Sequence, residues 1–288
     1  MIFIAIGTIV MTLLSCLLYK AHLNTRQAAV NRVEINAGRE RPGSSFNVLH
    51  ISDMHLEHIS VTPEQLYEQL KEEKIDLIAL TGDYLDRKRS IPKLVPYLQV
   101  FNQLQPTCGI FAVFGNHDYV LKDESFAALK ETLERNGCRT LRNENAFFVK
   151  DGASINVIGI DDYSTNRSNI AASYKGVKEG YRLVLTHDPN IVLAMRKVHY
   201  DYLLSGHFHG GQIHWPKPYH LAKMGKLVGM NMIKGLHVYD GKPFYISEGL
   251  GQTGVNIRMG SRPEITLHRL PLHSAASKAE QQKTLAAI

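Results

Sequence analysis

Short apolar runs separated by polar stretches make up most of this chain, after one long apolar segment at its start. From residue 46 on, most runs are rich in Val, Ile and Leu and stop abruptly at Asp, Gly, Asn or His. Runs of this length and composition are typical of buried strands. The pattern predicts strands at 48–51, 77–80, 110–114, 155–160, 183–185 and 202–204.

Stretches of helical length lie between several of these runs. One is predicted to begin at Thr62, which is followed by Pro63 and Glu64 as in a capped helix start. A second covers 126–135 and ends before Asn136-Gly137. Because strands alternate with helices, the pattern predicts an α/β fold. A hairpin and a last strand are predicted at 235–239, 244–247 and 264–270.

The first 19 residues are almost unbroken apolar sequence, at the short end of the roughly 17–25 residues that a membrane helix needs. No Lys or Arg precedes this run, which argues against a cleaved signal peptide. By the positive-inside rule we expect a single-pass anchor in the cell inner membrane with the catalytic domain in the cytoplasm. The alternative is a lipoprotein, because Leu13-Leu14-Ser15-Cys16 loosely resembles a lipoprotein box. The positive charges that follow the run are at Lys20, Arg26, Arg32, Arg39 and Arg41.

These patterns divide the chain into four parts. We predict a transmembrane anchor at 1–19, a polar linker at 20–45, a catalytic domain at 46–272 and a flexible tail at 273–288. The linker ends in Arg-Pro-Gly-Ser-Ser, and the tail is small and polar.

Charge and cysteine content narrow the classes of partner. The net charge of +6 is spread over the chain, so we expect no nucleic-acid partner, whereas phosphate-bearing substrates and an anionic bilayer surface fit. The three cysteines form no metal-binding spacing. Free thiols are favoured over a disulfide between Cys108 and Cys138.

Seven side chains that can bind metal ions follow the predicted strands. Any single Asp or Asn there can be a simple turn or cap residue, but seven such residues in this order indicate a site. Oxygen and imidazole ligands suit Mn²⁺, with Fe or Zn²⁺ as alternatives, and seven exceed what one tetrahedral site needs. We therefore expect two divalent metal ions that share one carboxylate. The candidate ligands are Asp53, His55, Asp83, Asn116, His187, His207 and His209.

The arrangement of these residues resembles the calcineurin-like metallophosphoesterases. The matching motifs are Asp53-x-His55, Gly82-Asp83, Gly115-Asn116-His117-Asp118, His187 and Gly206-His207-x-His209. The resemblance implies a four-layer α-β-β-α sandwich. It also implies one metal on Asp53, His55, Asp83 and His209, and a second on Asp83, Asn116, His187 and His207. The segments 206–213 and 247–265 look like the membrane-anchored bacterial phosphodiesterase branch of that family.

Three further residues are candidates for the chemistry. His117, next to Asn116, is predicted to donate a proton to the leaving oxygen or to stabilise charge there. Asp86 corresponds to a carboxylate that orients this histidine in related phosphatases, with a turn residue as the alternative. Arg258 is predicted to bind the substrate phosphate, with simple surface exposure as the alternative. Roles for His58, His214 and Asp161-Asp162 are left open.

The chain is therefore expected to hydrolyse phosphodiester or pyrophosphate bonds, on a membrane lipid or a nucleotide-linked lipid. The stretch 215–233 is a candidate for contact with acyl chains, or else an ordinary loop. A phosphomonoesterase or phosphoprotein phosphatase is the alternative within hydrolases. A metal-binding scaffold without turnover is the alternative outside them.

Overall fold

A computed structural model describes residues 1–35, 45–214 and 217–272. The predicted tail at 273–288 lies outside the described residues. The helices are α1 (Ile2–Asn24), α2 (Pro63–Leu70), α3 (Ile91–Gln103), α4 (Asp123–Arg135), α5 (Ile170–Ser173) and α6 (Lys226–Gly229). The strands are β1 (Ala29–Glu34), β2 (Ser45–Ile51), β3 (Leu77–Thr81), β4 (Ile110–Val113), β5 (Cys138–Thr140), β6 (Glu144–Lys150), β7 (Ala153–Gly159), β8 (Tyr181–Leu185), β9 (Tyr202–Ser205), β10 (Gly235–Tyr239), β11 (Lys242–Ile246) and β12 (Glu264–Pro271).

The strands form two six-stranded sheets, with the orders β1-β12-β2-β3-β4-β5 and β10-β11-β9-β8-β7-β6. In the first sheet β2 to β5 are parallel, and in the second β7, β8, β9 and β11 are parallel. The carboxyl ends of parallel strands meet at one edge, which is where sheets of this kind carry their ligands.

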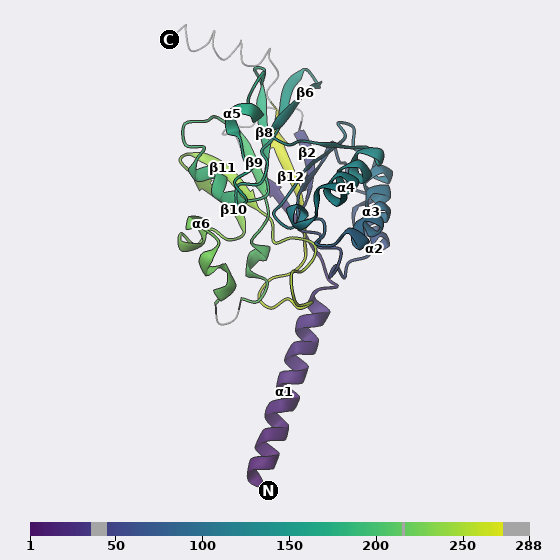
Figure 1. The fold of residues 1–288 in the computed structure, drawn as a ribbon, viewed down its shortest axis with the longest axis vertical. Helices are drawn as coiled ribbons and strands as arrows, with labels where there is room; N and C mark the ends of the chain where they lie inside the picture. The colour runs from purple at the N-terminus through teal and green to yellow at the C-terminus, as the bar shows by residue number, and fades with distance from the viewer. Residues whose placement is uncertain (36–44, 215–216, 273–288) are drawn as a thin grey trace.

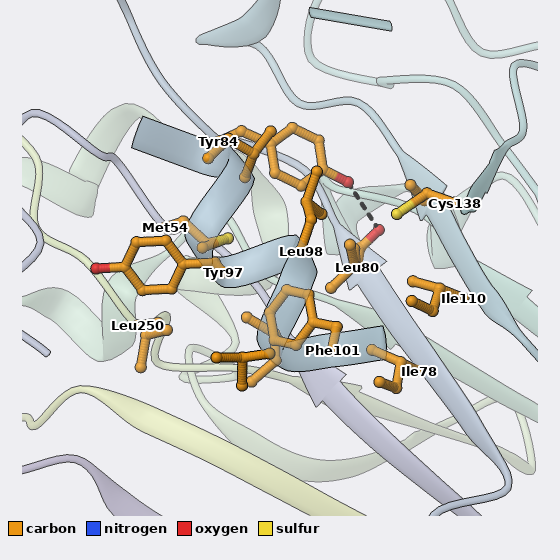
Figure 2. Close-up of a cluster of buried hydrophobic side chains, with 14 of the residues drawn as sticks. Met54, Ile78, Leu80, Tyr84, Tyr97, Leu98, Phe101, Ile110, Cys138 and Leu250 are labelled. Atoms are coloured by element: carbon orange, nitrogen blue, oxygen red, sulfur yellow. Dashed lines mark hydrogen bonds between the residues drawn. The ribbon is translucent and has the colours of Figure 1, made fainter. Parts of the chain in front are cut away.

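Three apolar clusters hold the layers together. Alternate side chains of both sheets, such as Val48, Leu77, Val157 and Leu183, pack between the sheets. The opposite face of the first sheet packs against α2, α3 and α4, and Figure 2 shows Leu98 and Phe101 of α3 beside strand residues Ile78 and Leu80. The outer face of the second sheet packs against the segment that contains α6 (Figure 1). These layers confirm the predicted α-β-β-α sandwich.

The local signals identified most elements correctly. At α2, Thr62 Oγ1 accepts from the Gln65 N–H at 3.3 Å and Gln65 Oε1 accepts from the Thr62 N–H at 3.0 Å, which is a capping box behind Pro63. The predicted hairpin forms between β10 and β11. All three cysteines are free thiols.

The predicted linker at 20–45 differs from the structure in two respects. The helix that contains the predicted anchor at 1–19 continues to Asn24, and residues 29–34 form β1, which pairs in parallel with β12. The supposed linker therefore carries an edge strand of the first sheet. β1 is an edge strand with one neighbour, and its residues are half-buried and of mixed polarity. Its sequence therefore lacks the apolar run that predicts the central strands.

The helix α1 projects away from the domain as a single rod (Figure 1). It has 23 residues, and those at 2–20 are all exposed. Nothing in the described part of the chain covers this apolar surface. A long apolar helix that is exposed on all sides suits a bilayer and not water.

Candidate metal centre

The predicted ligands lie on loops that leave the strands at one edge of the two sheets. Asp53 and His55 follow β2, Asp83 follows β3 and Asn116 follows β4. From the second sheet, His187 follows β8, and His207 and His209 follow β9. Main-chain hydrogen bonds join the loops across the edge: the Asp53 N–H donates to Gly82 O at 3.0 Å, and the Gly206 N–H donates to His187 O at 3.0 Å.

The main chain is strained at these residues. Asp53, His55, Asp83, His207 and His209 all have positive φ angles, between 37° and 75°. This region costs a residue with a Cβ about 1 kcal/mol or more, and such strain collects at functional sites. The close packing of the loops enforces it, because a Cβ at Gly115 would lie 2.2 Å from Asp83 Oδ1.

Asp53, His55 and His209 form one group of converging ligand atoms. His209 Nε2 lies 3.3 Å from Asp53 Oδ1 and 3.1 Å from His55 Nε2. All three side chains are buried.

Asp83, His187 and His207 form the second group. His187 Nε2 lies 3.1 Å from Asp83 Oδ2, and His207 Nδ1 lies 3.2 Å from His187 Nε2. Asp83 Oδ2 is also 3.6 Å from His55 Nε2, so Asp83 lies between the two groups. This is the position that a bridging carboxylate requires.

The donor set fits two divalent cations. Pairs of imidazole nitrogens point at each other in both groups, and a cation between them would satisfy both lone pairs. Asn116 Oδ1 is buried without a hydrogen-bond partner among the described residues, next to His117, whose N–H donates to Asp83 Oδ1 at 2.8 Å. Buried polar atoms without partners are rare in proteins, and a missing ion is one explanation. The structure thus brings six of the seven predicted ligands together in these two groups, with Asn116 next to His117 beside them, and their individual roles stay predictions.

Electrostatics hold Asp83 in its charged form. Burial raises the pKa of this carboxyl, but the positive charge and hydrogen bond of His187 outweigh that effect and hold the pKa well below its usual range. A carboxylate that stays ionised is the form that binds metal.

His117 and Asp86 form a pair at the rim of the centre. His117 Nδ1 lies 2.8 Å from Asp86 Oδ1, which is 3.4 Å from His55 Nδ1. Burial lowers the pKa of His117, but the hydrogen bond and charge of Asp86 raise it to about 9. His117 has 31% of its side chain exposed to solvent, whereas the side chains of the six clustered ligands are buried. The predicted orienting contact of Asp86 is therefore present in the geometry.

Sequence reasoning gave no role to Asp118 or Glu57, which brace the site. Asp118 accepts main-chain hydrogen bonds from Asp83, Tyr84 and Gly115 at 2.8–2.9 Å, so it ties the loops after β3 and β4 together. Glu57 accepts from the N–H groups of Asp86 and Arg87. The sequence signal that could have identified Asp118 is its place in the same motif as Asn116 and His117.

The predicted contact of Arg258 with substrate is wrong. Its side chain is fully buried, and both terminal nitrogens donate to main-chain oxygens, including His209 O at 2.9 Å and Gly251 O at 2.6 Å. A guanidinium enclosed in this way cannot reach a phosphate in solvent.

The described part of the stretch 215–233 packs on the domain, as the ordinary-loop alternative predicts, and contact with acyl chains stays a prediction. Trp215 lies outside the described residues, and Leu221, Leu227 and Ile233 point into the core beneath the second sheet. In the described part of this stretch, one large apolar residue faces solvent: Met230, which is 45% exposed.

Comparison with known proteins places these features in one family. The pattern of the calcineurin-like phosphoesterases matches residues 46–211. The uncharacterized metallophosphoesterase YkoQ of Bacillus subtilis is 64% identical over 254 residues, which cover 88% of this chain and 94% of that protein. The phosphodiesterase YaeI of Escherichia coli is 27% identical, over 78% of this chain and 82% of its own. A Bos taurus transmembrane protein with a metallophosphoesterase domain is 27% identical over 91% of this chain and 61% of its own length.

Proposed function

Because the chain belongs to the calcineurin-like phosphoesterase family, we propose that it is a membrane-anchored hydrolase of phosphodiester or pyrophosphate bonds. Family and ligand set together indicate a metal-dependent phosphoester hydrolase. The phosphodiester preference is supported by the similarity to the Escherichia coli phosphodiesterase. One observation carries the proposal: two groups of buried Asp and His ligands share Asp83 between them.

Each residue would have a distinct task. Asp53, His55 and His209 would hold one cation, His187 and His207 would hold the other, and Asp83 would contact both. The family pattern and its Oδ1 atom, unpartnered among the described residues, would assign Asn116 to the second cation. Two bound cations, with Mn²⁺ preferred and Fe or Zn²⁺ as alternatives, would supply positive charge and Lewis acidity to the phosphate and to water.

His117 would hold a proton for the leaving oxygen. Its imidazole is partly exposed at the rim of the ligand groups, where a departing alkoxide can reach it. Asp86 would fix the ring through Nδ1, which leaves Nε2 to carry the proton.

The membrane location rests on α1. Its exposed apolar surface fits a single span, and Lys20 and Arg26 lie at its carboxyl end, so the catalytic domain would face the cytoplasm. The bovine relative is named as a transmembrane protein, which supports an anchor.

The position of the anchor supports a lipid substrate. In the last turn of α1, Ala21 O accepts a hydrogen bond from the Arg258 N–H, and Asn24 Nδ2 donates one to Arg258 O. The side chain of Arg258 in turn donates to His209 O. The metal centre would therefore lie near the bilayer surface, where lipid headgroups are concentrated. A membrane lipid or a nucleotide-linked lipid would be the substrate.

A substrate comparison tests this function. The full chain in detergent micelles with Mn²⁺ is assayed on bis-p-nitrophenyl phosphate, p-nitrophenyl phosphate and a lipid-linked nucleotide diphosphate. Turnover of the diester and the lipid substrate well above that of the monoester supports the proposal. Preference for the monoester indicates a phosphomonoesterase or phosphoprotein phosphatase, and bound metal without any turnover indicates a scaffold.

A further inference from the structure

The last turn of α1 belongs to the catalytic domain and not to the membrane span. Residues 1–20 are all exposed, whereas Ala21 is 2% exposed and Thr25 is fully buried. The Thr25 hydroxyl donates to Ser60 Oγ at 2.9 Å, and His22 Nδ1 lies 3.0 Å from Asn256 O. We call residues 21–25 the stem of the anchor.

The stem holds the main chain of one residue, Arg258, on both sides. The Arg258 N–H donates to Ala21 O at 2.9 Å, and Asn24 Nδ2 donates to Arg258 O at 3.0 Å. Ala21 O is available because the Thr25 N–H donates to His22 O instead, as happens where a helix ends.

The side chain of Arg258 extends from the stem into the metal centre. Nη1 donates to His209 O at 2.9 Å and to Glu248 O at 2.8 Å, and Nη2 donates to Gly249 O at 3.0 Å and to Gly251 O at 2.6 Å. No carboxylate of the described residues forms a salt bridge with it. A fully buried guanidinium that binds only main-chain oxygens and a hydroxyl fixes the path of the chain around it.

The segments held by Arg258 carry or support the ligands of the first group. His209 is itself a ligand and has a φ of 50°, which the chain does not favour without support. Gly249 packs directly on Asp53, because a Cβ at Gly249 would lie 2.7 Å from Asp53 Cβ. Asp53 O also accepts from the Gly251 N–H at 2.7 Å.

We infer that Arg258 is a positioning residue and that the stem of the anchor is a structural part of the metal centre. The stem fixes Arg258, and Arg258 fixes His209 and the segment behind Asp53. Order in the Asp53, His55 and His209 group therefore depends on the membrane anchor. This inference deepens the proposed function, since it assigns the control of one metal position to a contact outside the ligand set.

Asn24→Ala in the full chain, in detergent micelles, tests the inference. It removes one hydrogen bond to Arg258 O and leaves every ligand in place. Its matched control is Leu23→Ala, in the same turn, because Leu23 is 37% exposed. Loss of a residue that supports metal ligands costs about 10-fold to 100-fold in metal affinity. We expect Asn24→Ala to weaken one of two Mn²⁺ sites about 10-fold by calorimetry, and Leu23→Ala to weaken neither.

Hydrogen exchange of the metal-free protein gives a second readout that needs neither metal nor substrate. In Asn24→Ala, the amides of Leu250 and Gly251 should exchange about 10-fold faster than in the control, because their hydrogen bonds to Ser52 and Asp53 lose support. Arg258→Lys, which keeps the charge but loses the planar fork, should show both effects more strongly. Wild-type metal affinity and exchange in Asn24→Ala would overturn the inference. Both effects in a protein that hydrolyses no phosphoester would uphold it and overturn the proposed function instead.

Discussion

Asp83 lies between the two ligand groups, so its charge is the one that both cations would share. Asp83→Asn keeps the shape of the side chain and removes this charge. We expect the bound metal to fall from two ions towards one per chain and turnover to be lost. Elemental analysis after gel filtration measures the first effect. Two tightly held ions and a normal rate in this variant would contradict the shared-carboxylate arrangement.

His117 tests the separation of proton transfer from metal binding. We expect His117→Ala to lower kcat by about 10²–10⁴-fold, the range for loss of an acid–base group, with metal content unchanged. The loss should be smaller for a nitrophenol leaving group, which needs no proton. Asp86→Asn should show the same dependence on the leaving group, because Asp86 acts through His117 Nδ1. Equal losses for good and poor leaving groups would exclude proton donation.

A third residue-scale prediction concerns two histidines buried between the sheets. Burial lowers the pKa of His50 to about 3 and holds that of His268 well below its usual value. The groups that face them are Thr81, Tyr202, Tyr245 and each other, and Glu264 lies behind Tyr245. Both histidines are therefore neutral in the folded protein, whereas the unfolded chain binds protons below about pH 6.5.

The free energy of unfolding should consequently fall as the pH drops below about 6.5. The contribution of each histidine approaches about 1.4 kcal/mol per pH unit between its unfolded and folded pKa values. We expect His50→Gln, which can keep a hydrogen bond to Thr81, to show a shallower slope in urea unfolding of the metal-free protein between pH 5 and 7. Val157→Ala, which is buried between the same two sheets and removes no titrating group, is the control and should keep the wild-type slope. Identical slopes in the two variants would refute the neutral, buried state of His50.

At the scale of elements, strands and ligands could be predicted from the sequence, but their distant supports could not. The seven candidate ligands follow five apolar runs, as Asp83 follows Leu77–Thr81, so the signal is local. The strand β1 is half-buried and pairs with β12, more than 200 residues later, and no local pattern encodes that pairing. Arg258 was misassigned for the same reason. An arginine near a predicted phosphate site suggests a contact with substrate. Only the fold of 247–261 shows that the terminal nitrogens of Arg258 are enclosed by main-chain oxygens.

The structure also changes the expected effect of removing the anchor. With an anchor at 1–19 and a linker at 20–45, deletion of residues 1–25 is expected to release an intact domain, but that cut removes the buried stem residues Ala21 and Thr25. A deletion of 1–18 spares them. The stem makes four hydrogen bonds to the domain, through Ala21 O, His22 Nδ1, Asn24 Nδ2 and Thr25 Oγ1. At about 1 kcal/mol for each lost bond and about 2–4 °C per kcal/mol in a domain of this size, the longer deletion should lower the melting temperature by roughly 8–16 °C. Differential scanning calorimetry of both proteins measures this. Equal melting temperatures would show that the stem contributes nothing to the domain.

At the scale of the whole molecule, the positive charges beside the anchor predict which side of the membrane the metal centre occupies. The helix α1 leaves the domain as a rod (Figure 1). The Arg258 N–H donates to Ala21 O near the end of this helix, with Lys20 just before that residue and Arg26 just after the helix. Positive residues next to a span stay on the cytoplasmic side, so the domain should be cytoplasmic. In spheroplasts of an expressing bacterium, added protease should leave the domain intact, and in inverted membrane vesicles it should digest it. Lys20→Glu together with Arg26→Glu should increase the fraction of the domain that protease digests in spheroplasts. Arg32→Glu, on β1 and farther from the span, should change this fraction less. Digestion of the wild-type domain in intact spheroplasts would place the metal centre on the opposite side and exclude cytoplasmic lipid headgroups as its substrate.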